Sequence, residues 1–255
     1  MPPNQGNLYA ELALDLAGEN ITGVSIVVQE GTTVSGRVQF EGSRTIAPGE
    51  VFPVRVSMTN VLPTRFSFGS ASTSSNIGAT FTIPGVPPGK MRFAGQAISN
   101  QPGPNQPPVS PVASWVLKSA TLNGRDVLDL PLDVAVGRSI DGVVLTFTDR
   151  MAELSGAVLD AAGTTNADLY VMLLPADRAY WATPTSRRFR APVTAGLDGR
   201  YRFTNLPSGD YLLVALGDVD GLDTTDASVL EQLAAGGIKI TIADGEKKTQ
   251  DIRTK

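Results

Sequence analysis

The sequence predicts an all-β protein built from two tandem Greek-key β-sandwiches of seven strands each, with one short helix in the second. Three observations predict this class. Short segments alternate apolar and polar residues between clusters of Gly, Pro, Asn and Ser, which is typical of strands. One phrase occurs twice without a gap, as FTIPGVPPGKM at 81–91 and as YRFTNLPSGDY at 201–211, 120 positions later. A single segment, DASVLEQLA at 226–234, spaces its apolar residues as a helix face.

The strands expected from alternation follow the same plan in both halves. The first half has candidates at 32–40, 51–58, 130–136 and 141–148, and the second at 153–160, 167–175, 199–206, 210–216 and 237–243. In each copy of the repeated phrase, a Pro-x-Gly turn between two apolar runs predicts a hairpin. The Pro-rich run at 100–111 cannot join a sheet interior, so we expect an exposed loop there in place of the helix.

Further matches set the domain boundaries. VSGRV at 34–38 resembles LSGAV at 154–158, and GENITGV at 18–24 resembles GRSIDGV at 137–143. A repeat of about 120 residues suits tandem domains of ordinary size. We therefore expect an N-terminal hairpin left from a preceding repeat at 1–30, a first sandwich at 31–148 and a second at 149–255, joined near Thr148–Met151.

The N-terminal segment 12–28 resembles the expected closing hairpin of the first sandwich at 131–147. Its apolar face would be costly to leave in water. We expect it to pack against the first sandwich, or to add to a sheet edge of another molecule and so give oligomers through this hairpin. A disordered stub is the alternative. The apolar face consists of Leu12, Leu14, Leu16, Val24, Ile26 and Val28.

Composition excludes several classes of function. The formal net charge is −4 with Lys and Arg scattered, so we expect no nucleic acid partner. No apolar run approaches 18 residues, so no membrane span is expected, and the start shows no signal-peptide pattern. His and Cys are both absent, which removes Ser-His-Asp triads, thiolate nucleophiles and imidazole or thiolate metal sites. We expect no enzymatic activity, because the residue types usually recruited to activate a nucleophile are missing.

Two clusters are candidate binding sites. The segment AYWATPTSRRFR brings aromatic rings near guanidinium groups, which can stack on sugars or anchor a protein interface. Pairing of these side chains across an exposed sheet face is the favoured alternative. The candidate residues are Tyr180, Trp181, Arg187, Arg188 and Arg190.

The segment GDVDGLDTTD places four carboxylates within nine residues, Asp218, Asp220, Asp223 and Asp226. Carboxylate oxygens are the ligands that calcium prefers, so calcium is the one cofactor that the sequence leaves open. The alternative is a solvated acidic loop in which Asp226 caps the helix. The spacing does not follow the EF-hand pattern, which favours the alternative.

The motifs also carry a family resemblance. SGRV or SGAV at the start of each unit, together with DGRYRFTNLPSGDYLLVA at 198–215, resembles the carboxypeptidase regulatory-like domain, a seven-stranded transthyretin-like (prealbumin-like) sandwich. The second unit matches both motifs, whereas the first lacks the aromatic residue after the turn and carries the Pro-rich insertion. The resemblance implies tandem copies in a large exported bacterial protein, an extracellular or cell-envelope location, and no catalytic residue.

Three functional classes remain after these observations. We place first a non-enzymatic structural or spacer module of a larger exported or cell-envelope protein, whose partners are other domains of the same or neighbouring chains. Second is a binding module for carbohydrate or protein that uses the aromatic and arginine face. Third is an enzyme that uses paired carboxylates, which no spacing in the sequence favours.

Overall fold

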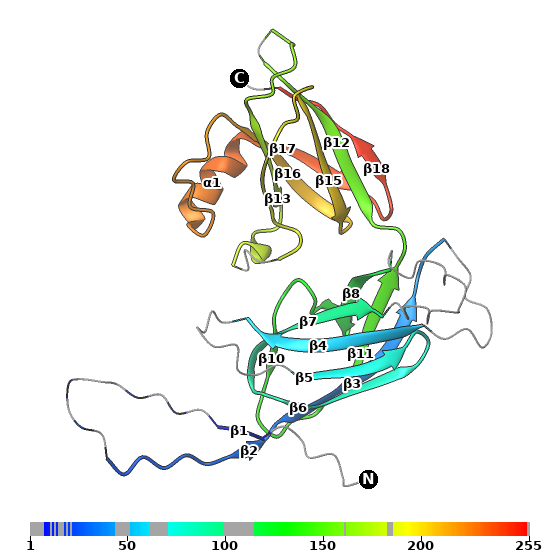
Figure 1. Cartoon of the computed structure of the whole chain (residues 1–255), viewed down its shortest axis with the longest axis vertical. Coiled ribbons are helices and arrows are strands. Elements are labelled where there is room, and N and C mark those ends of the chain that lie inside the picture. The colour runs from blue at the N-terminus through cyan, green and yellow to red at the C-terminus, as the bar shows by residue number, and fades with distance from the viewer. Residues whose placement is uncertain are drawn as a thin grey trace, which may run out of the picture. The chain divides into compact units, whose positions relative to one another are not determined.

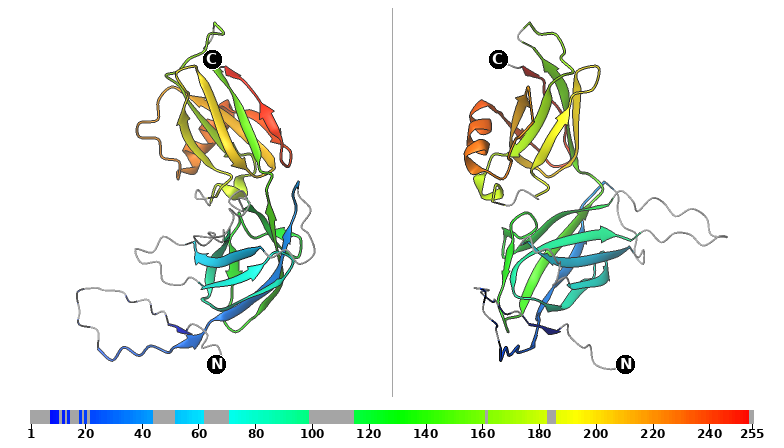
Figure 2. Two further views of the ribbon diagram at one scale, coloured as in Figure 1. Left: turned by 45° about the vertical axis from the view of Figure 1, so that its right-hand side comes forward. Right: turned by 60° about the vertical axis from the view of Figure 1, so that its left-hand side comes forward.

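The computed structural model describes residues 8–10, 12, 14, 18, 20, 22–43, 52–61, 71–98, 115–160, 162–182 and 186–253. Strands are the dominant secondary structure of these residues, with one short α-helix, which confirms the all-β class. The chain divides into two compact units, Met1–Phe147 and Thr148–Lys255 (Figures 1 and 2). Within the part of the chain that is described, no helix is long and apolar enough to cross a membrane.

In the first unit, β1 and β2 form a small ladder and nine strands form one sheet, in the order β5-β4-β7-β8-β11-β3-β6 with β10 beside β7 and β9 beside β8. Strand β8, which follows the Pro-rich run, neighbours both β7 and β11, so these nine strands form one sheet. The predicted two sandwiches of seven strands each are therefore not confirmed. The strands are β1 Leu8–Tyr9, β2 Gln29–Glu30, β3 Thr32–Phe40, β4 Pro53–Asn60, β5 Ala71–Asn76, β6 Thr80–Val86, β7 Gly89–Ala97, β8 Val116–Leu122, β9 Arg125–Asp126, β10 Leu132–Val134 and β11 Ile140–Thr148.

The second unit has two four-stranded sheets. One has the order β15-β12-β18, with β19 continuing along β12, and the other has the order β14-β13-β16-β17. The predicted helix is confirmed as α1 Ala227–Gly236. The remaining elements are β12 Ala152–Leu159, β13 Tyr170–Pro175, the 3₁₀ helix η2 Arg178–Tyr180, β14 Arg190–Thr194, β15 Arg200–Leu206, β16 Gly209–Leu216, β17 Ile238–Ile242, β18 Lys247–Thr249 and β19 Ile252–Arg253.

The two units share the pairing of their first strands residue for residue. Gly36 of β3 lies opposite Phe81 of β6, and Gly156 of β12 lies opposite Tyr201 of β15. The last strand of each unit runs parallel to the first, β11 beside β3 and then β18 and β19 beside β12. Alternating apolar residues of these strands fill separate cores, with Leu145 and Phe147 in the first unit and Leu154 and Val158 in the second.

The prediction of a hairpin at each Pro-x-Gly turn is wrong. Strand β6 pairs with β3 whereas β7 pairs with β4, β8 and β10, and β15 pairs with β12 whereas β16 pairs with β13 and β17. The turn carries the chain to a different set of strand partners instead, and Gly85 and Asn205, two residues before the prolines, have positive φ, 68° and 55°. In the second unit the buried Tyr211 hydroxyl donates to the Pro207 carbonyl at 2.7 Å, which holds the turn.

The prediction of a closing hairpin at 131–147 is also wrong. Strand β10 pairs with β7, strand β11 pairs with β3, and the two strands do not pair with each other. Among the described residues of 12–28, none lies in a strand, and β1 pairs with β2 just outside them. The expected packing of this face on the first sandwich is not observed, since Leu12 and Ile26 are 46% and 58% exposed. Leu16 and the Pro-rich run 100–111 lie outside the described residues.

Candidate functional site

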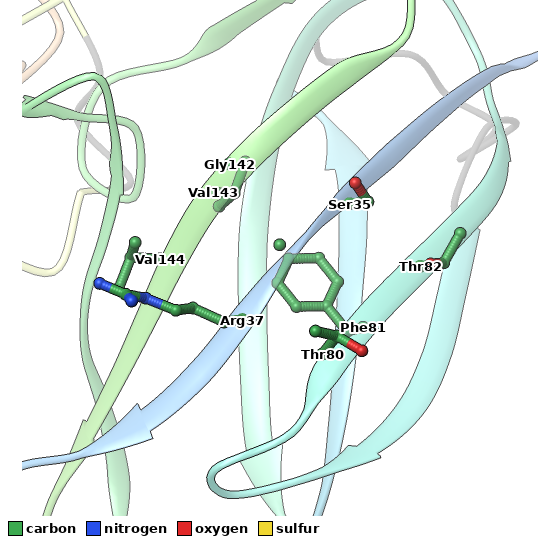
Figure 3. Close-up of a pocket in the computed structure, with 9 residues that line it drawn as sticks. Ser35, Arg37, Thr80, Phe81, Thr82, Gly142, Val143 and Val144 are labelled. Atoms are coloured by element: carbon green, nitrogen blue, oxygen red, sulfur yellow. The ribbon is translucent and has the colours of Figure 1, made fainter.

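An open hollow of about 530 Å³ lies on the face of the first unit where β3 runs between β6 and β11 (Figure 3). Three consecutive residues from each strand line it, around Gly36, Phe81 and Val143. Its polar groups include the hydroxyl of Ser35, which donates to Asp141 at 2.5 Å, and the exposed Arg37. This is an open depression on a sheet face with both apolar and polar groups in its lining, and none of the residues that line it is a buried charged residue.

At the centre of the hollow, the repeated Ser-Gly motif lets the closing strand approach the first strand closely. A Cβ at Gly36 would lie 1.9 Å from the carbonyl oxygen of Val143, and a Cβ at Gly156 would lie 1.9 Å from that of Gln250. The parallel closing strand therefore passes directly over the glycine in both units. Near Gly156 the Tyr201 hydroxyl also donates to the Gln250 carbonyl, and burial, with a smaller contribution from the Asp251 charge, raises the pKa of Tyr201 above its ordinary value.

The predicted aromatic and arginine site is only partly accessible. Trp181 is 8% exposed and packs with Met172, Leu174 and Leu230. Its indole Nε1 donates to the Pro175 carbonyl at 2.8 Å, so its only polar group is already bonded. The indole therefore belongs to the core under α1.

The arginines of this site bind the backbone of their own unit. The guanidinium of Arg188 lies 5.0 Å from the centre of the Tyr180 ring and donates through Nη1 to the Ser208 carbonyl at 2.8 Å. Arg190 donates through Nη2 to the Asn205 carbonyl at 2.7 Å. These hydrogen bonds hold the Pro-x-Gly turn between β15 and β16 in place. Arg187, Arg188 and Tyr180 are half-buried, so a ligand role for this face stays a prediction.

Sequence reasoning missed the residue that connects η2 to α1. Arg178 forms two hydrogen bonds with Glu231, from Nε at 2.5 Å and from Nη2 at 2.7 Å, and its guanidinium lies 5.2 Å from the Trp181 ring centre. The hydrogen bonds to Glu231 raise the pKa of Arg178 and lower that of Glu231. The two residues are 53 positions apart, so no local spacing could have paired them.

The predicted acidic site is a series of local turns. Asp226 caps α1, accepting from the Ser228 amide and hydroxyl at 2.7 Å, and Asp223 accepts from the Thr225 hydroxyl at 2.6 Å. The pKa of each carboxyl is lowered, chiefly by the hydroxyl bond. Asp218 accepts from the amide of Asp220. Among the described residues, no three acidic side chains lie close enough together to hold a metal ion. Calcium binding therefore stays a prediction from the sequence.

Comparison with known proteins gives structural similarities only. No protein family matches the chain, and no curated protein does. A streptococcal ancillary pilin is 14% identical with a TM-score of 0.33, over 88% of this chain and 62% of its own length. A minor pilin of Streptococcus agalactiae is 12% identical with a TM-score of 0.34, over 88% and 95%. The shaft pilin SpaA of Lactobacillus rhamnosus GG is 11% identical with a TM-score of 0.28, over 87% and 96%.

Proposed function

We propose that this chain is a non-enzymatic spacer module of a larger exported or cell-envelope protein, and that each sandwich carries tension along the chain. The observation that supports this function is the parallel pairing of the first and last strands in both units. Strand β11 pairs with β3 from Ile140 opposite Val34 to Phe147 opposite Phe40. Strands β18 and β19 pair in the same sense with β12.

This pairing decides where the chain enters and leaves each unit. In a parallel pair both strands run in the same direction, so the chain enters at one end of the pair and leaves at the other. An antiparallel pair of terminal strands would bring entry and exit to the same end. Each unit therefore adds the length of its terminal strands to the path of the chain, which is what a spacer requires.

The same pairing decides how a unit responds to tension. When the chain is pulled at both ends of a unit, the two strands are sheared past each other, and their ladder bonds must break together. Each ladder bond contributes about 1 kcal/mol net, and the strands also hold fully buried side chains such as Val34 and Leu145. Pulling from one end would break the bonds one after another. A sheared unit therefore unfolds at a higher force.

Single-molecule force measurements test this proposal, since a chain without Cys accepts engineered attachment points at chosen positions. Thr33→Cys with Arg150→Cys shears β3 against β11, whereas Thr33→Cys with Ser139→Cys pulls both strands from the end where they begin. We expect the first pair to require the higher unfolding force at equal pulling speed, because unfolding under force follows the barrier to unfolding. Equal forces for the two attachments would contradict the spacer function.

The finer assignments belong to the same proposal. We assign both units to the plan of the carboxypeptidase regulatory-like domain, with seven strand positions that the two units share and with β8 and β9 as additional strands of the first unit. The support is the shared register around Gly36 and Gly156 and the shared change of strand partners after β6 and β15. An extracellular or cell-envelope location follows from that resemblance. The partners of a spacer are other domains of the same or neighbouring chains.

A binding module for carbohydrate or protein is the second candidate, and the half-buried Tyr180 ring with the Arg188 guanidinium above it favours it. Planar aromatic and guanidinium groups can stack on sugars or anchor a protein surface. A glycan array and a pull-down with the full chain test this role, with Tyr180→Ala as the matched variant. Binding that Tyr180→Ala abolishes would support this candidate, and no binding in either assay would exclude it.

A further inference from the structure

Residues 18–28 resemble residues 137–147 in sequence, and two glycines of this segment share a backbone conformation with their counterparts. Gly18 and Gly23 have φ of 87° and 74°, and their counterparts Gly137 and Gly142 have φ of 68° and 84°. These positive values favour glycine, and both glycines recur at the same spacing. Gly18 and Gly23 therefore lie in the same left-handed region as the glycines before and within β11.

The two copies differ in burial. Val143, Leu145 and Phe147 of β11 are all 0% exposed, because they point into the core of the first unit. Their counterparts are largely in water, with exposed fractions of 45% for Val24, 58% for Ile26 and 56% for Val28. Figure 1 shows this segment in blue as an extended trace that leads into β2. The alternation suited to a core is present, but the described part of this unit supplies no core for it.

The segment also holds the same position along the chain as the closing strands of the first unit. Strand β11 ends at Thr148 and β12 begins the second unit at Ala152. In the same way Val28 comes shortly before β3, which begins at Thr32. In both cases a closing strand precedes the first strand of the next unit by a few residues.

The two complete copies show what such a segment pairs with. Strand β10 lies antiparallel to β7, which follows the Pro-x-Gly turn, and β17 lies antiparallel to β16 in the same way. The next strand, β11 or β18, then runs parallel to the first strand of its unit. Both receiving edges are thus occupied by the chain's own strands in each of its units.

We propose that residues 22–28 are the closing strand of a further β-sandwich unit of this plan, and that they bind a sandwich body whose receiving edge is unoccupied. That edge is the first strand of the body, with which residues 22–28 pair in parallel. Main-chain ladder bonds supply the pairing, and the alternate side chains Val24, Ile26 and Val28 enter the core of that body. This interaction goes beyond the proposed spacer function, which concerns each unit by itself.

A graft within the full chain tests this inference, because the first unit contains a body of the required kind. In the first variant, residues 138–146 are replaced by residues 19–27, which places Val24 and Ile26 at positions 143 and 145. The matched control replaces the same positions with residues 18–26, one residue out of register. A slip of one residue turns every side chain of a strand to the opposite face, so the control puts Gly and Ser into the core.

We expect the in-register graft to keep the thermal transition of the first unit within about 10 °C of its original midpoint, and the out-of-register control to lose it. Phe147 stays in both variants, so its large side chain fills the core equally. Loss of the transition in both variants would overturn the inference, and so would its retention in both.

The mass of the unaltered chain in solution tests whether a second copy of the chain covers this segment instead. A second copy of this chain offers no unoccupied receiving edge, so we expect a monomer over a wide concentration range, for the unaltered chain and for Ile26→Asp alike. A dimer that Ile26→Asp abolishes would show that a second copy covers the segment, and it would overturn the inference.

Discussion

Gly36 and Gly156 lie where the closing strand passes so near that even a methyl group cannot fit. A Cβ at Gly156 would approach the Gln250 oxygen to 1.9 Å, which a backbone atom cannot relieve without moving the strand. We expect Gly156→Ala to lower the free energy of unfolding of the second unit by about 2 kcal/mol or more in urea titrations. Gly217→Ala is the control, since a Cβ there meets nothing within 4 Å and should change the free energy by less than about 0.5 kcal/mol. Equal losses would contradict the close approach.

Tyr201 connects the same closing strand to β15 through its hydroxyl. We expect Tyr201→Phe, which installs the residue type found at position 81, to cost about 1 kcal/mol at pH 7. Burial raises the pKa of Tyr201, so above pH 10 the unfolded chain loses the phenolic proton before the folded chain does. The contribution of Tyr201 is complete below pH 10 and is lost as the pH rises towards the folded-state pKa.

Urea titrations between pH 9 and pH 11.5 measure this pH dependence. The free energy of unfolding should fall less steeply with pH in Tyr201→Phe than in the unaltered chain. An identical slope in the two proteins would show that the phenol titrates alike in the folded and unfolded states.

Helix α1 depends on the carboxylate at its first turn. We expect Asp226→Ala to lower the free energy of unfolding of the second unit by about 1 kcal/mol, because it removes the acceptor for the Ser228 amide. Asp220→Ala, in the same acidic segment and exposed, should change it little. Thermal scans with and without calcium separate the two interpretations of this segment. A calcium-dependent rise in the midpoint that both substitutions abolish would establish a metal site there.

The strands could be predicted from the sequence more completely than their partners. Alternation is local, so β3, β12, β15 and β16 were expected close to their observed bounds. Which strands pair is decided by side chains far apart in sequence, so the Pro-x-Gly turn predicted a hairpin although the strands before and after it have different partners. A feature that accompanies this change of strand partners is the residue two positions before the proline, Gly85 or Asn205, which adopts positive φ.

The candidate site shows the same limit. Within 180–190, the guanidinium of Arg188 lies over the Tyr180 ring, whereas Trp181 is buried under α1. Their burial could not be predicted, because Trp181 is covered by Leu230 of a helix that lies about 50 positions later in the sequence. The carbonyl partners of Arg188 and Arg190 are likewise supplied by a turn that local spacing does not reveal.

At the scale of the whole molecule, the two units have separate cores. We expect calorimetry to resolve two transitions, and Leu145→Ala and Leu213→Ala each to move one of them. Both side chains are fully buried, and such truncations cost about 2–5 kcal/mol. If either substitution moved both transitions equally, the units would unfold as one body.

The parallel ladder between β3 and β11 also sets when a unit can become complete as the chain is made. Ser35 and its partner Asp141 are 106 positions apart, so nearly all of the first unit must be synthesised before its first strand gains its last neighbour. Contacts of such separation form slowly, because the chain loses much conformational entropy before they stabilise it. Until then the edge of β3 that receives β11 stays open to other strands, including those of neighbouring nascent chains. The unfinished first strand is therefore the place where a unit of this kind is exposed to pairing with the wrong closing strand.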